Sequence, residues 1–235
     1  PWYLKEAEKI KQEFLMADIQ FFNDDYQMKI APYFHRTRDT FWLDRDNPFF
    51  SRNDHATYVM GNTFGIRPLD NAFFAEIENR REYIRSTNLS ERERFEHHLR
   101  AGVQDQLAGP LRYEASLDGG YFDGFPFELS PKAAVFYDMS DAWTLYTKAE
   151  RKYRTPSFTE LYYNSPSNIG NANLQLQRTD NYETGLLYKQ ERWNAGGDVF
   201  FRDQQDTIDW VRNTGDTAFQ AINAGKTSIR GVDLF

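Results

Sequence analysis

Adjacent histidines are the first residues of this chain whose types could do chemistry. His97 and His98 follow one another directly. Consecutive residues of a β-strand point to opposite faces, so the two imidazoles could not easily share one metal ion on a strand. His98, Glu96 and Ser116 could face one lumen as base, acid and nucleophile, but no nucleophile-elbow or metalloprotease spacing occurs. We therefore expect neither a metal centre nor an enzyme.

A second group of candidate ligands lies around an acidic stretch. His35 and His55 stand near four aspartates, which are Asp39, Asp44, Asp46 and Asp54. Carboxylate oxygens are the ligands that Ca²⁺ prefers. The spacing matches no fixed calcium motif, so a solvated acidic loop is the better interpretation. We expect no resident cofactor.

The composition combines two properties that rarely occur together in a soluble protein. Aromatic residues make up 17% of the 235 residues, yet 27% are charged and the mean hydropathy is -0.75. A transmembrane β-barrel needs rings at its two membrane interfaces and polar side chains in its lumen. The net charge of -7 argues against nucleic-acid binding. The absence of cysteine permits an oxidising compartment.

Alternation of apolar and polar residues predicts about eleven β-strands. No run of roughly 18 apolar residues occurs, so no transmembrane helix is expected. Most of the alternating segments have ten or more residues, which is enough for the roughly 9–11 residues that a tilted strand needs to cross a bilayer. The expected strands are 13–22, 26–35, 57–66, 72–85, 94–106, 111–121, 127–138, 142–153, 181–189, 192–203 and 220–235.

The connections between these strands alternate between short turns and longer polar loops, as in outer-membrane barrels. The short turns are Asn23–Asp25, Arg67–Asn71, Leu107–Pro110, Met139–Asp141 and Gln190–Glu191, and the longer stretches are 36–56, 86–93, 154–180 and 204–219, with a shorter exception at Asp123–Pro126. The opening Lys5–Glu13 is rich in helix formers, and we interpret it as an exposed loop that runs into a strand.

Two sets of residues are candidates for function. Polar residues on the inward faces should solvate a lumen; these are Glu76, Glu78, Arg80, Arg100, Arg112, Glu114, Lys132 and Glu183. Loops on a rigid scaffold usually carry recognition, and the loop residues that could bind a ligand are Trp42, Tyr162, Tyr163, Asn164, Trp210 and Arg212. The alternative for the aromatic residues is that they pack the loops together or lie at the membrane interface.

From about Leu129 to Leu234 several short segments occur in a distinctive order. Leu129–Lys132 opens a strand, and Tyr153–Phe158 is followed by Glu160–Tyr163 and then by Asn171–Leu174. The further segments are Asn181–Gly185, Phe201–Asp203, Ile208–Trp210, Asn223–Lys226 and Ile229–Asp233. The ordered set resembles the barrel of TonB-dependent outer-membrane receptors, including their aromatic-Arg-Ala-Pro loop and their Asn-Pro-Asn-Leu box. Ala172 stands where the family commonly has proline.

This resemblance implies a specific architecture and function. Residues 1–235 would form part of an antiparallel, all-β transmembrane barrel, with about eleven of the 22 strands expected of such a transporter. The plug domain and the last strands would lie outside the chain. The receptor would reside in the outer membrane of a Gram-negative bacterium, bind a scarce and bulky nutrient, and import it with energy from the TonB–ExbB–ExbD complex. A surface lipoprotein that caps the loops is compatible with this resemblance.

The sequence leaves more than one ligand and more than one protein class open. The segments from Ile208 to Val232 are most similar to cobalamin receptors, so cobalamin or another corrinoid is the first expectation and a ferric siderophore the second. The stretch from Tyr153 to Asn173 contains no histidine, which disfavours haem. The alternatives from other classes are a passive outer-membrane porin or adhesin and a soluble β-rich binding module. An upstream plug would separate the receptor from a porin, and dependence on detergent would separate both from a soluble module.

Overall fold

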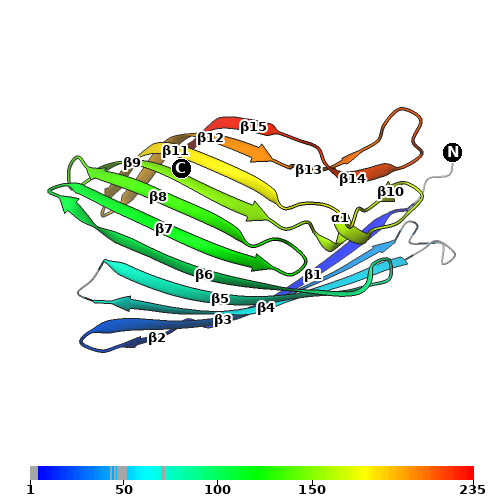
Figure 1. Ribbon diagram of the computed structural model, residues 1–235, viewed down its shortest axis with the longest axis horizontal. Coiled ribbons are helices and arrows are strands. Elements are labelled where there is room, and N and C mark those ends of the chain that lie inside the picture. Colours follow the sequence, from blue (N-terminus) through cyan, green and yellow to red (C-terminus); the bar gives the residue numbers. More distant parts are fainter. Residues whose placement is uncertain (1–4, 43, 45, 47–51, 70–71) are drawn as a thin grey trace.

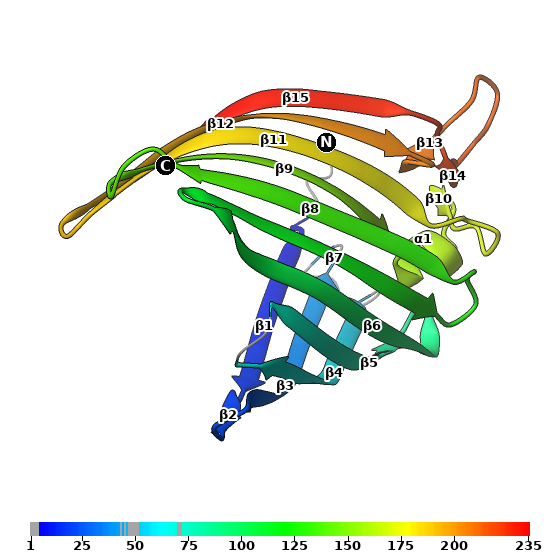
Figure 2. The ribbon, with the colours of Figure 1, turned by 60° about the vertical axis from the view of Figure 1, so that its left-hand side comes forward.

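The chain folds into one large, strongly curved antiparallel sheet. The computed structural model describes residues 5–42, 44, 46, 52–69 and 72–235. Figure 1 shows the strands side by side along the length of the molecule, and Figure 2 shows how the sheet curls so that one face is concave. The sheet has twelve strands in the order β1-β3-β4-β5-β6-β7-β8-β9-β11-β12-β15, with β2 paired to β3 beside this path.

The large sheet holds most of the chain. Its strands are β1 (Ala7–Met16), β2 (Ile19–Phe22), β3 (Tyr26–Trp42), β4 (Arg52–Pro68), β5 (Phe73–Ser86), β6 (Ser90–Ala108), β7 (Leu111–Phe122), β8 (Glu128–Asp138), β9 (Trp143–Arg154), β11 (Gln177–Gln190), β12 (Trp193–Gln205) and β15 (Thr227–Leu234). A helix, α1 (Phe158–Tyr162), and three short strands, β10 (Asn168–Ile169), β13 (Ile208–Val211) and β14 (Phe219–Asn223), lie in the connections at one end. None of the helices in the described ranges is long and apolar enough to span a membrane.

β1 and β2 occupy a single position across the sheet. Both pair with β3, and Ala17 between them still donates its N–H to Pro32 O at 3.1 Å. The sheet is therefore eleven strands wide, which confirms the number expected from the alternating pattern. The segment 13–22, predicted as one strand, is interrupted at Ala17 and Asp18.

The interpretation of Lys5–Glu13 as a loop is wrong, because most of this segment belongs to β1. Its charged side chains find partners within the sheet. Glu13 accepts from Arg36 at 3.2 Å and from Lys11 at 2.7 Å. Pairing with the edge of β3 supplies backbone hydrogen bonds that override the helix propensity of the sequence.

Two predicted loops are shorter than expected, because polar strand ends pair with each other. β3 continues to Trp42 and β4 begins at Arg52, where Thr40 donates to Asp54 at 2.8 Å. The stretch 86–93 contains only a tight turn between β5 and β6, in which Ser86 Oγ accepts from the N–H groups of Asn88 and Leu89, each at 3.1 Å. An alternation of apolar and polar residues cannot reveal these strand ends, because their side chains do not face lipid or an apolar core on either side of the sheet.

The predicted strand 220–235 is also two elements. β14 turns back to pair with β13, and only β15 joins the large sheet beside β12. Gly225 between them has a φ of 99°, a backbone conformation that favours glycine. The chain can therefore leave the small sheet and enter the large one within a few residues.

The convex face carries the apolar band. Phe64, Ile77 and Leu99 are neighbours on β4, β5 and β6, and 43%, 46% and 58% of their surfaces are exposed. Aromatic rings mark the end of the band where the strands are joined by short turns, and Trp143 packs there on Tyr188 with ring centroids 4.7 Å apart. Rings of this kind lie at the membrane interface in outer-membrane barrels. The high content of aromatic residues is therefore consistent with rings at a membrane interface.

The register shows that the strands are tilted. One row of cross-strand neighbours begins at Phe73, the first residue of β5, and passes through Val103 and Ala115 to Tyr182 and Phe201. Phe73 lies at the short-turn end of its strand, whereas Phe201 lies near the opposite end of β12. A row perpendicular to the strands therefore crosses the apolar band from one side to the other. This is expected for strands tilted by roughly 35–45° to the axis of a barrel.

Candidate functional site

The concave face of the sheet forms a polar hollow of about 1050 Å³. Five of the residues predicted to face the lumen line it, namely Glu76, Arg80, Arg100, Glu114 and Lys132. Glu78 lines a smaller hollow beside it, and the register puts Arg112 on the face of Glu114 and Glu183 on the face of Lys148. All eight predicted lumen residues therefore lie on the concave face.

Most of these lumen side chains have a polar partner on the sheet. Lys132 lies 2.7 Å from Glu114, and Arg100 lies 3.2 Å from Glu76. Arg112 donates to Asp138 at 2.8 Å, and Glu183 accepts from the Tyr146 hydroxyl at 2.7 Å. Because each of these charged groups has a partner, none of them leaves an uncompensated charge in the lumen.

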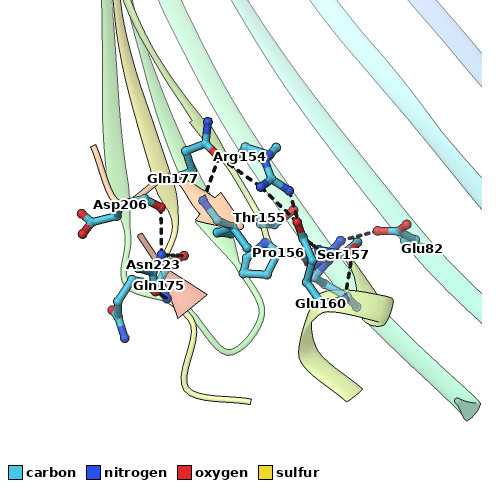
Figure 3. Close-up of polar contacts among 12 residues, drawn as sticks. Glu82, Arg154, Thr155, Pro156, Ser157, Glu160, Gln175, Gln177, Asp206 and Asn223 are labelled. Atoms are coloured by element: carbon cyan, nitrogen blue, oxygen red, sulfur yellow. Dashed lines mark hydrogen bonds and ion pairs between the residues drawn. The ribbon is translucent and has the colours of Figure 1, made fainter. Parts of the chain in front are cut away.

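The connection after β9 is built around a short capped helix. Ser157 is the N-cap of α1; its side chain accepts from the N–H of Glu160, whose carboxylate accepts from the Ser157 N–H in return. Arg154, at the end of β9, holds the same carboxylate with two hydrogen bonds of 2.9 and 3.2 Å and also donates to Gln177 at 3.0 Å (Figure 3). The capping box thus ties the helix to both β9 and β11.

A second connection, after β12, packs against the first. Leu161 and Leu174 from the first connection form a buried cluster with Ile208 and Ala221 from the second. β10 pairs with β14 in parallel. Asn223 receives the N–H of Gln175 at 2.9 Å and donates to the carbonyl of Asp206 at 2.8 Å (Figure 3). Residues 155–176 and 206–226 therefore form one packed unit, which we call the loop cap.

The loop cap also contacts the wall of the sheet at β6, three strand positions away from β9. Arg94 on β6 donates to the carbonyl of Pro156 at 2.7 Å, and Thr155 lies 3.4 Å from Glu96. Phe158 is buried together with Ile84 and Leu89 from the β5–β6 hairpin, so that the hairpin and the loop cap share an apolar core. The fold therefore places an ordered cap over one end of the polar hollow.

The family of the chain follows from its match to a family model. The model described as TonB dependent receptor-like, beta-barrel matches residues 12–235. The chain belongs to this family. It is a family of transport receptors rather than enzymes; its members reside in the outer membrane and bind a small-molecule ligand.

Solved structures with a similar fold include three iron-related receptors of about 15% sequence identity. The siderophore receptor PirA from Pseudomonas aeruginosa has a TM-score of 0.74 and 15% identity over 98% of this chain. A mutant of the ferric enterobactin receptor of the same organism, in complex with enterobactin, has a TM-score of 0.75 and 14% identity over 97%. The FrpB iron transporter from Neisseria meningitidis has a TM-score of 0.73 and 14% identity over 97%. These matches cover 47%, 41% and 41% of those chains, so this chain spans less than half of their length. None of the three supports the specific resemblance to cobalamin receptors.

The predicted ligand residues of this TonB-dependent receptor barrel lie in different environments. Tyr162 is 37% exposed at the end of α1, with the Arg92 guanidinium 4.3 Å from its ring centroid. Tyr163 packs on the cluster of Phe158, and Trp210 packs on the cluster of Leu174. The last two rings thus take the alternative role of holding the loops together in this structure.

The other three predicted ligand residues are polar or stand apart. Asn164 is exposed and pairs with Ile169 in an isolated bridge. Arg212 lies 5.0 Å from the ring centroid of Phe219. Trp42 is at the end of β3, where the Arg52 guanidinium lies 5.6 Å from its ring centroid, and it is not part of the loop cap. Only Tyr162, Asn164 and Arg212 combine exposure with a place on the cap.

The histidines of the receptor barrel have structural partners. His97 faces outward and stacks on Tyr121, whereas His98 faces the hollow and lies 3.3 Å from Asp118. The predicted opposite orientation of the two side chains is confirmed. Within the described ranges, no group of three or more His, Asp or Glu side chains is arranged to hold a metal ion.

Sequence reasoning missed the residues that dock the loop cap. Arg94 and Leu89 carry no recognisable motif, and Leu89 falls in a stretch predicted to be a loop although it is only 2% exposed. A signal that could have revealed α1 is the spacing of Ser157 and Glu160, which is that of a capping box at a helix start. Their docking partners on β6 lie far away in the sequence and could not be paired with them from the sequence alone.

The capping box should make the order of the loop cap depend on pH. Burial by itself would raise the pKa of Glu160, but the hydrogen bonds from Arg154 and Ser157 outweigh it and lower the pKa below the usual 4.5. A lowered folded-state pKa means that this stabilisation is fully present above pH 4.5 and is lost as the pH falls through the folded-state pKa. We expect amide protection factors of α1, corrected for intrinsic exchange, to fall in that range. In the Glu160→Gln variant, α1 should be less protected at neutral pH and this pH dependence should disappear; an unchanged dependence would contradict the assignment.

Gly170 should not tolerate a side chain. A Cβ at this position would lie 2.8 Å from Tyr162 N and 2.9 Å from both Glu160 O and Leu161 C, which are all backbone atoms. Overpacking of this kind costs about 1–3 kcal/mol. We expect the Gly170→Ala variant to lose that amount of protection against exchange across α1. Ala172→Ser, which adds one atom at an exposed position of the same connection, serves as control and should change protection by less than about 0.5 kcal/mol.

Proposed function

We propose that the receptor containing this barrel imports a ferric siderophore across the outer membrane, with energy supplied by the TonB–ExbB–ExbD complex. In this proposal the loop cap contacts the ligand on the outer side, since long loops face outward in such barrels and short turns face the periplasm. A plug domain of the same receptor fills the lumen and contacts the polar residues of the concave face. A surface lipoprotein over the loops is a further candidate partner.

The charge of the hollow is the observation that supports an anionic ligand. Its basic lining residues are Lys29, Arg67, Arg80, Arg94, Arg100, Lys132, Arg151, Lys152 and Arg154, and its acidic ones are Glu76, Glu82, Glu96, Glu114, Asp118 and Glu150. The lining is thus basic in balance, although the whole chain carries a net charge of -7. A lining with a net positive charge attracts anionic ligands.

This charge favours an iron complex over a corrinoid. Ferric tris-catecholates are anions, whereas cyanocobalamin has no net charge. Two of the solved structures of similar fold are, by their descriptions, a siderophore receptor and a ferric enterobactin receptor. Cobalamin is therefore the second candidate ligand. Haem is the third, because the described part of the loop cap contains no histidine that could bind its iron.

Ligand binding by the full-length receptor in detergent tests the proposal. The receptor would be titrated with a ferric catecholate siderophore, cyanocobalamin and haem, and quenching of tryptophan fluorescence would be recorded. We expect saturable siderophore binding that weakens as the salt concentration rises. Saturable binding of cyanocobalamin alone would overturn the siderophore assignment. Uptake by cells that lack TonB would overturn the active-transport mechanism and indicate a passive porin.

A matched pair of lysine variants tests the role of charge. Lys152 lines the hollow and its side chain is 69% exposed. Lys189 is also exposed but lies at the short-turn end of β11. We expect Lys152→Gln to weaken siderophore binding by about two- to fivefold, the range for an exposed charge, and Lys189→Gln to leave it unchanged. Equal effects of the two variants would show that the local charge of the hollow does not matter.

A further inference from the structure

Arg94 is a buried cation that joins two distant parts of the chain. Its side chain is only 6% exposed and forms an ion pair with Glu82 on the neighbouring strand β5. The same guanidinium donates to the carbonyl of Pro156 at 2.7 Å and lies 5.1 Å from the ring centroid of Phe158. One side chain of the barrel wall therefore binds both the start of the loop cap and the first residue of α1. Figure 3 shows this junction, with Glu82, Thr155 and Pro156 labelled.

The neighbouring inward position of β6 supports the same junction. Glu96 has a side chain that is 4% exposed and lies 3.4 Å from Arg94 Nε. It also lies 3.2 Å from Arg80 and accepts from the Thr155 hydroxyl at 3.4 Å. Two charge-assisted hydrogen bonds, to Glu82 and to the Pro156 carbonyl, together with the nearby Glu96 carboxylate, hold the buried guanidinium in one geometry. Such a group fixes the position of its partner more strictly than an apolar contact would.

The first connection is in turn fixed to the second. Leu174 from the first and Ala221 from the second share a buried cluster, and 2% and 0% of their surfaces are exposed. Asn223 bridges Gln175 and the carbonyl of Asp206. The described contacts of Arg94 all lie within β5, β6 and the first connection. Outside the sheet, the contacts of Arg94 therefore reach the second connection through the first.

We propose that Arg94 is a positioning residue that sets the placement of both connections at once, so that residues 155–176 and 206–226 act as one capture element. The contacts of Arg94 with Glu82, Pro156 and Phe158, which we call the clamp, place Tyr162 and Arg212 on one common body, the loop cap. Release of the clamp would free both connections together. The inference rests on the proposed function only for its ligand readout, since the coupling between the connections can be measured without a ligand.

Hydrogen exchange of the ligand-free, full-length receptor in detergent tests this coupling. Removal of one partner from a buried ion pair leaves the other charge uncompensated, so Arg94→Gln should speed amide exchange in α1 by at least about a hundredfold. We expect β13 and β14, which Arg94 does not touch, to exchange faster to a similar extent. Arg100→Gln is the control, because Arg100 lies on the same face of the same strand, pairs with Glu76 and is 44% exposed. It should leave exchange in both connections unchanged.

A second variant tests the direction of the coupling. Asn223→Ala removes the bridge between the connections but leaves the Arg94 junction intact. We expect faster exchange in β14 with little change in α1. Faster exchange of α1 alone in Arg94→Gln would overturn the single capture element, and unchanged exchange in both connections would overturn the role of Arg94. Should Arg94→Gln prevent folding, Arg94→Lys keeps the charge without the forked geometry, and the same comparison of α1 with β13 and β14 decides.

The ligand readout separates this inference from the proposed function. In Arg94→Gln, siderophore affinity measured at a temperature at which the variant barrel is fully folded should fall by at least about tenfold, and Arg94→Lys should recover part of the affinity. A purely structural role would leave the affinity of the folded variant unchanged and would overturn the positioning role. Absence of siderophore binding by the unmodified receptor would count against the proposed function, whereas the exchange result would still decide the inference.

Discussion

The Leu174→Ala variant is expected to destabilise the loop cap by about 2–5 kcal/mol, the range for removing a buried leucine side chain. Leu174 is 2% exposed and packs with Leu161, Ile208 and Ala221, two of which come from the other connection. The cavity would therefore weaken the contact between the connections as well as the local fold. Native-state hydrogen exchange would report the loss as reduced protection in α1, β13 and β14.

The control for this variant is Ile169→Ala. Ile169 belongs to the same connection, but 42% of its surface is exposed. Its truncation should cost less than about 1 kcal/mol, because less apolar area returns to water. Equal losses for Leu174→Ala and Ile169→Ala would contradict a buried core shared by the two connections.

The second large effect is expected on the convex face, where Leu99→Arg should destabilise the barrel by about 2–4 kcal/mol. Leu99 is 58% exposed on the face that carries the apolar band, beside Ile77. In a bilayer an arginine there would be transferred from water into hydrocarbon. Urea unfolding of the full-length receptor in lipid vesicles would measure the cost.

Ser116→Arg is the matched control for the membrane face. Ser116 lies on β7 beside the hollow, where a guanidinium can stay hydrated and contact carboxylates. We expect its cost to be well below that of Leu99→Arg. The opposite order would reverse the assignment of the two faces and exclude the concave face as the lumen.

Leu99 and Leu174 lie in two separate apolar regions of the molecule. The band around Leu99 keeps the sheet in the membrane, whereas the core around Leu174 orders the connections above it. Damage to one region need not affect the other, because the clusters of the loop cap and the convex face share no residues. Separate measurements of barrel unfolding and of cap exchange can therefore distinguish a failure of folding from a failure of ligand capture.

Strands with two different environments could be predicted from the sequence because each residue alternates between them. From Leu111 to Tyr121 the alternation is unbroken, and the structure has β7 there. The prediction failed where this contrast is absent. Lys5–Glu13 carries polar residues on both faces. β1 forms there because the edge of β3 offers backbone hydrogen-bond partners to it. The same reason explains the underestimated length of β3 and β4.

The site shows a similar division. Glu114 and Lys132 were predicted to share one face, and both line the hollow of the concave face, because the direction of a strand side chain follows from its parity. For Tyr163 and Trp210 the sequence left two roles open, ligand contact and packing of the loops, because the pattern around a loop aromatic residue is the same in both cases. The clamp of Arg94 on Pro156 joins positions that no local pattern connects.

The sequence by itself determined the class of the protein: long alternating strands, rings for the membrane interfaces, polar residues for the lumen, and the ordered segments of a receptor family. These are local properties that backbone geometry and solvation impose residue by residue. Only the tertiary structure decided which charged segment became β1, that two connections form one cap, and that a buried arginine holds it. Those outcomes depend on contacts between residues far apart in the chain, whose free energies exist only once the sheet has brought them together.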